Sequence, residues 1–288
     1  MTRRFRAVMK LVIVVSIITC SISVNAETKK SGKRNVSTTK PSKYSSEPFD
    51  CTLESLPRNY LGQDLELLYA RLDKMRTNTP VKDEFETTEQ FKKRQEAYTK
   101  QPILKNINKD SVLAASLPAA LVYNADTQDA AVEIHIGNFV SSKYYLSQKD
   151  QKYCTAGNRV IKSKSYSDYM SNAFGATVKV EHNRADYVGL ALNNPEVFGL
   201  DKSNRCGNVI FKIQKMDTGI AKQLKNDFAV MIVFKIVDPY VETNSDYSEA
   251  TIDAPYESSA GYKYVVSNIK EAWVYSLSTG KVFLKEKY

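Results

Sequence analysis

The first apolar pattern in the chain has a helical period. Residues 62–78 carry an apolar side chain at every third or fourth position, namely Leu65, Leu68, Leu72 and Met75. This spacing places them in one stripe along a helix. Asp64 precedes the stripe and is a suitable N-cap. The pattern therefore predicts an amphipathic helix whose stripe packs against a core.

A second helix is predicted within the stretch KDEFETTEQFKKR, which begins at Lys82. Thr87 can cap its first turn, and Gln90, three residues later, completes a capping box. Phe91 lies within the helix, and Phe85 lies just before the cap. We expect a helix start built from Phe85, Thr87, Gln90 and Phe91 that docks through aromatic rings, with Phe85 pinning the entering chain.

From about residue 115 onward the period changes to two, as in β-strands. Residues 228–237 (FAVMIVFKIV) are apolar on both faces, which is typical of a central strand. The stretch ATVKVEHNRADYVGLALNN predicts a hairpin with strands near 176–182 and 186–193. Eight or nine such segments predict an α+β fold: a mostly antiparallel β-sandwich or curved sheet with the two N-terminal helices docked on it.

The N-terminus has the order of a secretory signal peptide. A basic head precedes a short apolar run, and the small residues Val24-Asn25-Ala26 follow. The run is too short to span a bilayer, so no transmembrane span is expected after cleavage behind Ala26. The alternatives are a retained anchor, a twin-arginine signal at Arg3-Arg4 and lipidation of Cys20.

Residues 27–48 are basic and almost without apolar side chains, so we expect a disordered tether. Of the 41 basic residues, four lie in residues 1–26 and six in the tether, which leaves 31 for the rest, against 30 of the 32 acidic residues. The net charge of the folded part is therefore +1, which does not predict nucleic-acid binding. The tether predicts a weak, salt-sensitive attraction to anionic surfaces.

The expected organisation has four parts: a signal peptide (1–26), the basic tether (27–48), a helical N-terminal segment (49–110) and a β-rich domain (111–288). Cleavage leaves three cysteines, Cys51, Cys154 and Cys206. Because export permits disulfides and the last two each lie beside a turn, Cys154–Cys206 is the favoured pair. Cys51 would then be free or paired with another chain, and three buried thiols remain the alternative.

Motifs for catalysis or cofactor binding are missing from the sequence. The patterns GxxxxGK[ST], GxGxxG, GxSxG, HExxH and CxxC do not occur. Glu133, His135 and His182 could hold a metal, but a solvated polar face explains them better. The 18 tyrosines are ordinary strand residues, although exposed ones can form interfaces. We expect no cofactor and no enzymatic activity.

Four blocks of sequence carry a resemblance: LPRNYLGQDLELLYARL, KDEFETTEQFKKR, SNAFGATVKV and WVYSLSTGKVFLKEK. Together they resemble a group of uncharacterised exported bacterial proteins, in which a Phe-Glu-Thr-Thr-x-x-Phe element is the most distinctive piece. That element corresponds here to residues 85–91. The resemblance implies a bacterial envelope setting, periplasmic or secreted, and implies no activity.

The function expected from the sequence is a binding or structural role in the bacterial envelope, with a protein or an envelope polymer as partner. Two alternatives stay open. One is a hydrolase of envelope polymers that uses carboxylates such as Asp246, Glu249 and Asp253, which lie in one polar stretch. The other is an inhibitor or immunity factor that neutralises an enzyme.

Overall fold

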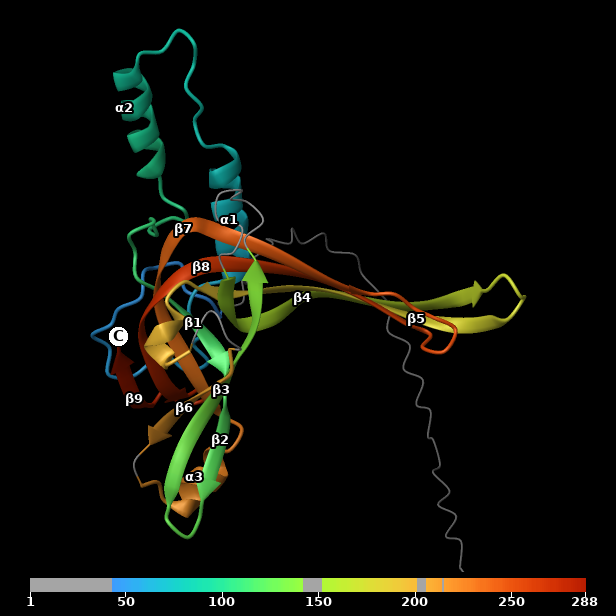
Figure 1. Ribbon diagram of the computed structural model, residues 1–288. Helices are drawn as coiled ribbons and strands as arrows, with labels where there is room; N and C mark the ends of the chain where they lie inside the picture. The colour runs from blue at the N-terminus through green and yellow to red at the C-terminus, as the bar shows by residue number, and fades with distance from the viewer. Residues whose placement is uncertain (1–42, 142–151, 201–205, 214) are drawn as a thin grey trace, which may run out of the picture. The chain divides into compact units, whose positions relative to one another are not determined.

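The computed structural model describes residues 43–141, 152–200, 206–213 and 215–288 (Figure 1). The helices in this part of the chain are α1 (Leu65–Thr77), α2 (Thr88–Thr99), α3 (Thr218–Leu224) and the 3-10 helix η1 (Pro195–Phe198). The strands are β1 (Leu113–Pro118), β2 (Ala120–Asn124), β3 (Asp129–Ser141), β4 (Lys152–Ser171), β5 (Thr177–Leu192), β6 (Asn208–Ile213), β7 (Phe228–Ser248), β8 (Tyr256–Ser276) and β9 (Val282–Lys287).

The described strands form one sheet in the order β1-β7-β8-β5-β4-β3-β2, with β6 paired to β3 and β9 paired to β8. All of these pairings are antiparallel except β5 with β8, which run parallel. The predicted fold class, an α+β fold built on a mostly antiparallel curved sheet, is therefore confirmed.

The core lies on both faces of the inner half of β7. Val230, Ile232 and Phe234 belong to the main apolar cluster, whereas Met231 and Val233 face a second cluster around Trp273. Alternate residues of a strand point to opposite faces, so a strand covered on both sides is apolar throughout. This explains the apolar run at residues 228–237 and confirms its central position.

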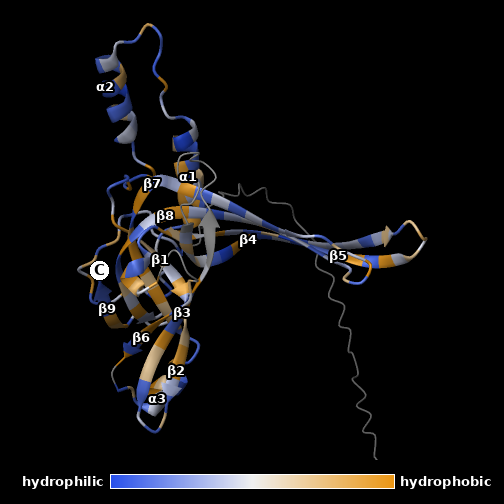
Figure 2. Cartoon of the chain, viewed as in Figure 1, coloured by the Kyte–Doolittle hydropathy of each residue, from blue (hydrophilic) through white to orange (hydrophobic). Residues whose placement is uncertain are grey.

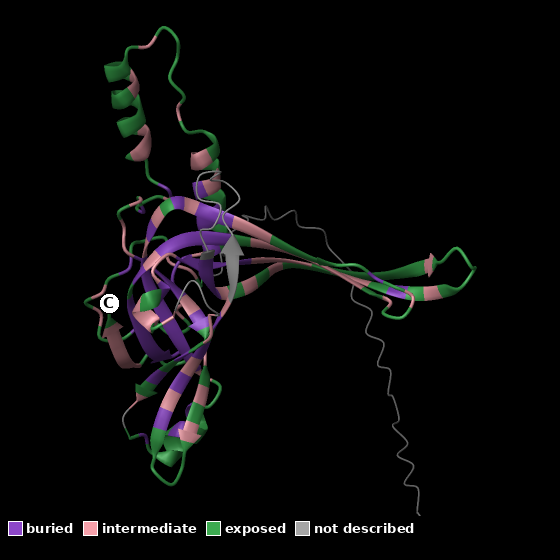
Figure 3. Ribbon diagram, in the orientation of Figure 1, coloured by how far each residue is buried: buried purple, intermediate pink, exposed green. Residues whose placement is uncertain are grey.

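Beyond the core, four strands continue side by side as an arm (Figure 1). The arm comprises residues 162–186 of the β4–β5 hairpin and residues 244–262 of the β7–β8 hairpin, in the order β7-β8-β5-β4. Hydropathy and burial both change along these strands: the inner halves are apolar and buried, and the arm is mostly polar and exposed (Figures 2 and 3). The arm is therefore a sheet without an apolar core of its own.

The hairpin predicted at residues 176–193 does not form. Residues 177–192 are the single strand β5, and Asn183 pairs with Ser165 of β4 and Ser258 of β8. The polar residues 183–185 suggested a turn. They lie in a strand because both faces of the arm are exposed, so polar side chains there reach water without interrupting the ladder.

The two N-terminal helices differ in how they pack. α1 buries Leu65, Leu68 and Leu72 against the sheet, as its apolar stripe predicts. α2 has no buried residue. The Tyr98 hydroxyl donates to the carbonyl oxygen of Met75 at 2.8 Å, and this hydrogen bond connects α2 to the end of α1. Docking is therefore strong for α1 and slight for α2.

The four expected parts of the chain correspond only in part to divisions of the structure. The expected signal peptide (1–26) and residues 27–42 of the expected tether lie outside the described residues. The end of the expected tether is bonded to the sheet region, since the Ser45 amide donates to Gly62 at 2.8 Å and Gln63 donates to the Glu47 carbonyl at 2.7 Å. The boundary expected near residue 110 falls inside one compact unit, Pro41–Tyr288.

Cys154 and Cys206 are joined by a disulfide that links β4 to the residues just before β6. Cys51 is a half-buried free thiol, and burial raises its pKa. Among the described residues, no helix is long and apolar enough to cross a membrane.

Candidate functional site

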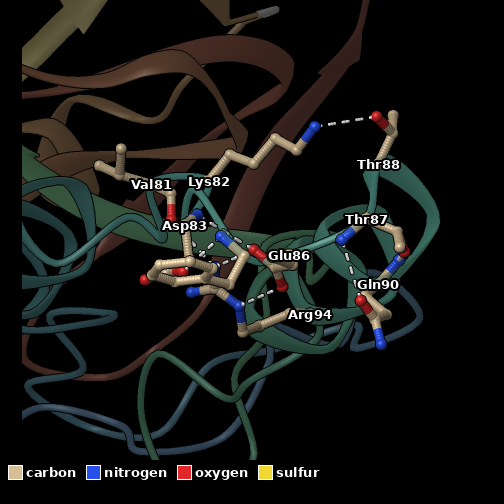
Figure 4. Close-up of polar contacts among 9 residues, drawn as sticks. Val81, Lys82, Asp83, Glu86, Thr87, Thr88, Gln90 and Arg94 are labelled. Carbon is tan, nitrogen blue, oxygen red and sulfur yellow. Dashed lines mark hydrogen bonds and ion pairs between the residues drawn. The ribbon is translucent and has the colours of Figure 1, made fainter.

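The helix-start motif has the local structure that its sequence predicts. Thr87 is the N-cap of α2: its side chain accepts from the Gln90 amide, and the Gln90 side chain accepts from the Thr87 amide at 2.9 Å (Figure 4). Arg94 also donates hydrogen bonds of 2.9 Å and 2.6 Å to the two carboxylate oxygens of Glu86. Arg94 donates as well to the carbonyl oxygen of Val81, so it fastens the loop to the helix.

The expected role of Phe85 is wrong. Its side chain is 88% exposed, because α2 buries nothing and offers the ring no apolar surface. Phe91 is half-buried, with the Arg94 guanidinium 5.6 Å from its ring centre. The contacts of Glu86 stabilise the loop that precedes α2. The hydrogen bonds from Arg94 also lower the pKa of the Glu86 carboxyl group. A carboxylate held in this way supports local structure rather than catalysis.

A cavity of about 530 Å³ lies between α1, β1, β3 and β4. Its lining is mainly apolar, with contributions from Leu61, Leu65, Leu117 and Ile134. At its polar side Arg159 donates to Asp64 at 3.0 Å and to the Tyr44 hydroxyl. A volume of this size is in the range of small-molecule pockets, but Arg159 already pairs with Asp64 at the polar side.

The arm carries the other candidate surface. The registers of its strands put residues from all four strands in common rows. One row contains Lys164, Arg184, Ser259 and Tyr247. The next row on the same face, two residues along, contains Tyr166, His182 and Glu257. Directly opposite residues in a sheet share a face. These seven side chains therefore form one surface, which we call the tyrosine–histidine face.

His182 is the centre of the tyrosine–histidine face. Its Nε2 lies 2.8 Å from Asp168 Oδ1, and its Nδ1 lies 3.1 Å from Glu257 Oε1. The ring stacks on Tyr166 with centroids 4.5 Å apart, and only 12% of the side chain is exposed. The residue thus joins β4, β5 and β8 in a region that has no apolar core.

The neighbours of His182 extend this network. Hydrogen bonding to Asp168, and then to Glu257, raises the pKa of His182, and the same contact with His182 lowers the pKa of Glu257. Arg184 donates to the Tyr166 hydroxyl at 3.2 Å. The Tyr247 hydroxyl donates to Glu257 Oε2 at 3.3 Å. When it is protonated, the imidazole lies as a clamp between two carboxylates.

This geometry decides what His182 can do chemically. A protonated histidine uses both ring nitrogens as donors, and here each faces a carboxylate. While it is protonated, the ring can neither accept a proton from a substrate nor bind a metal. Groups of three or more His, Cys, Asp and Glu side chains able to hold a metal are not found in the described part of the chain. The network suits a structural role that shapes a binding surface.

The arm also exposes large aromatic rings. Phe174, in the turn between β4 and β5, is 96% exposed, Tyr169 is 74% exposed and Tyr247 is 65% exposed. Aromatic side chains with this exposure favour binding surfaces, because each can bury a large area on contact. The three acids of the hydrolase hypothesis, Asp246, Glu249 and Asp253, are exposed on β7 and in the turn after it.

The sequence analysis missed the tyrosine–histidine face because it divided β5 into a hairpin. A signal was nevertheless present in the charges. Residues 236–262 contain six acids and no Lys, Arg or His, whereas residues 156–167 contain three basic residues and no acid. Such segregation within long polar strands indicates a shaped surface. Comparisons with protein-family models, curated proteins and solved structures found no match to this chain.

Proposed function

We propose that this chain is an exported protein of the bacterial envelope with a binding or structural role, and that the arm is its binding element. The order of the N-terminal residues supports export. The disulfide between Cys154 and Cys206 is of a kind that persists in oxidising compartments outside the cytosol. The resemblance to exported bacterial proteins points to the same setting.

One observation carries the binding role: four strands extend beyond the core and expose large aromatic rings to solvent. Ordering a backbone costs about 1–2 kcal/mol per residue, and the arm offsets little of that cost by apolar burial. Its contribution to folding is therefore small. A surface kept in shape by the His182 clamp is better explained by contact with a partner.

The hydrolase alternative receives no support from geometry, because Asp246, Glu249 and Asp253 are exposed and the cavity near Arg159 is lined by other residues. An inhibitor or immunity factor would be a special case of protein binding. It would use the same arm, so the two hypotheses share one experiment.

A shortened variant tests the binding role. Replacing residues 163–185 and residues 245–261 by Asn-Gly turns joins Lys162 to Asp186 and Asn244 to Tyr262, which face each other across the adjoining strands. Both the variant and the full chain are used to capture partners from envelope extracts by cross-linking and mass spectrometry. We expect the shortened protein to fold, judged by Trp273 fluorescence, and to lose the partners.

Retention of the same partners by a folded, shortened variant would contradict the binding role of the arm. Export is tested separately by the intact mass of the envelope-fraction protein, which should begin at Glu27. The tether is tested by deleting residues 27–42, which should abolish salt-sensitive adhesion to anionic vesicles.

A further inference from the structure

The two sides of the arm are open strand edges. Among the described residues, 162–171 of β4 pair only with β5, and 244–248 of β7 pair only with β8. An open edge presents backbone N–H and C=O groups that can pair with another strand. The arm therefore has two places where a further strand can add to the sheet.

The two edges run in the same direction. Residue numbers rise away from the core along both β4 and β7, whereas β5 and β8 return toward it. A second arm placed alongside, pointing the same way, would bring its β7 next to β4 of the first arm as a parallel pair. No inversion of either copy is needed.

The edges carry opposite charges. Lys162 and Lys164 are exposed on the β4 edge, where the acid Asp168 is paired with His182, and Asp246 is exposed on β7, with Glu249 just beyond its end. Like charges on open edges would keep copies apart. Opposite charges on the two edges of one arm instead attract the β4 edge of one copy to the β7 edge of another.

The exposed residues of the two edges lie at corresponding positions along the arm. Lys162 shares a row with Ser245, and Lys164 shares a row with Tyr247. Asp246 lies at the level between the two lysines, but its side chain points to the opposite face of the arm, toward Tyr262. A copy docked without any shift along the strands places Tyr247 beside Lys164 on one face, with Glu249 two residues beyond Tyr247.

We propose that the arm binds a second copy of this chain, with the β4 edge of one copy adding in parallel to the β7 edge of the next. This inference rests on the proposed binding role of the arm and names its partner. The contact uses different surfaces on the two copies, so it can repeat and produce a row or a ring of copies. Backbone pairing would provide the contact, and the opposite charges of the two edges would favour it over contact between like edges.

A cross-link across the edges tests this arrangement directly. Ser165 and Ser248 belong to one row, with Asn183 and Ser258 between them, so they lie three strand spacings apart, about 14 Å. A disulfide requires Cα atoms within about 7 Å. Cysteines at both positions therefore cannot join within one copy, but they meet when the β4 edge of one copy docks on the β7 edge of the next.

The double variant S165C/S248C is made in a Cys51→Ser background, which leaves every charge in place. Mild oxidation should produce a ladder of covalent oligomers, and peptide mapping should show residue 165 joined to residue 248. The matched controls S165C and S248C can form dimers at most. A double variant that stays monomeric, or dimers alone with like residues joined, would overturn the proposal.

Charge reversal gives an independent test. K162E/K164E and D246K/E249K should each weaken self-association about tenfold, since each gives the two edges charges of the same sign. An equimolar mixture of the two variants should recover assembly, because each then offers an edge that complements the other. Lys179→Glu, on the inner strand β5, is the control. Equal weakening by this control, or no recovery in the mixture, would contradict the proposal.

The two experiments distinguish failure of the self-association proposal from failure of the proposed binding role of the arm. If no ladder forms but the shortened variant still loses its envelope partners, the arm binds another molecule and only this inference is wrong. If the ladder forms and the shortened variant keeps its partners, self-association stands and the arm is not the element that captures them.

Discussion

The inner and outer halves of β7 show two ways of holding a strand in place. From Phe228 to Phe234 every residue is buried, whereas from Ser245 to Ser248 every residue is exposed. The inner half is fixed by apolar contacts on both faces. The outer half has only its neighbouring strands and polar side chains, so the two halves should differ greatly in stability although they belong to one strand.

The comparison shows where the energy of the fold is concentrated. A fully buried Val, Leu or Phe side chain is worth about 1.5–3 kcal/mol, and a cross-strand pair on an exposed face about 0.2–1 kcal/mol. The arm is therefore expected to open locally while the core stays folded. Binding elements are often found among such regions of low stability.

The largest expected effect belongs to the disulfide in the inner half of β4. The bond closes a loop across a sequence separation of 52 residues, for which the chain-entropy model gives about 4 kcal/mol. Replacing Cys154 and Cys206 by Ala should lower the free energy of unfolding by about that amount in urea titrations followed by Trp273 fluorescence. Cys51→Ala is the control, and an equal loss in the control would contradict the assignment.

A pair of substitutions on β5 compares the halves of one strand. Leu190 is fully buried in the main cluster, whereas Val178 is half-buried in the arm. Leu190→Ala should destabilise the protein by about 3 kcal/mol through the cavity it leaves. Val178→Ala should change global unfolding by less than about 1 kcal/mol. Similar losses at the two positions would show that the arm unfolds together with the core.

The cap of α2 should have a smaller and local effect. Thr87→Ala removes the capping box, which costs about 1 kcal/mol, while Thr88→Ala leaves both bonds of the box in place. Because α2 has no buried residue, the loss should appear as faster amide exchange in α2 and not in the global unfolding measured at Trp273. A shift of global unfolding in Thr87→Ala would mean that α2 is coupled to the core.

The His182 clamp should make the arm sensitive to pH, with little effect on the core. Contacts with Asp168 and Glu257 raise the pKa of His182 above its value in the unfolded chain. The clamp is therefore fully present below the unfolded pKa of about 6.5 and is lost as the pH rises through the higher folded pKa. Other charged or titratable groups facing it are Lys164, Arg184, Tyr166 and Tyr247.

Amide protection in the arm, corrected for intrinsic exchange rates, should fall in the native protein as the pH rises above about 6.5 and through the folded pKa of His182. The variant His182→Gln should remove this dependence. Protection that falls equally in His182→Gln would show that another group is responsible.

Much of the fold could be predicted from periodicity, because burial imposes a period on the sequence. The stripe of α1 and the apolar run of β7 are both produced by contact with the core, and both were predicted. The capping box at Thr87 and Gln90 could be predicted as well, since it depends on residues three positions apart. Contacts of this kind need no knowledge of the rest of the chain.

The arm could not be predicted in the same way, because exposed strands carry no period of burial. The residues Asn183 to Ala185 are typical of a turn, and only their partners on β4 and β8 show that the strand continues. The clamp joins Asp168, His182 and Glu257 from three strands. Long-range pairing decides that arrangement, and the sequence shows it only through segregated charges.

Native-state hydrogen exchange along β7 and β8 tests the central claim most directly, since both halves of each strand report in one experiment. We predict that amides in 228–236 and 264–275 exchange only through global unfolding, so that urea raises their exchange rates as strongly as it promotes unfolding. Amides in 244–248 and 256–262 should exchange through local opening, with far less protection and almost no response to urea. Equal protection along the whole length of both strands would contradict the division between core and arm.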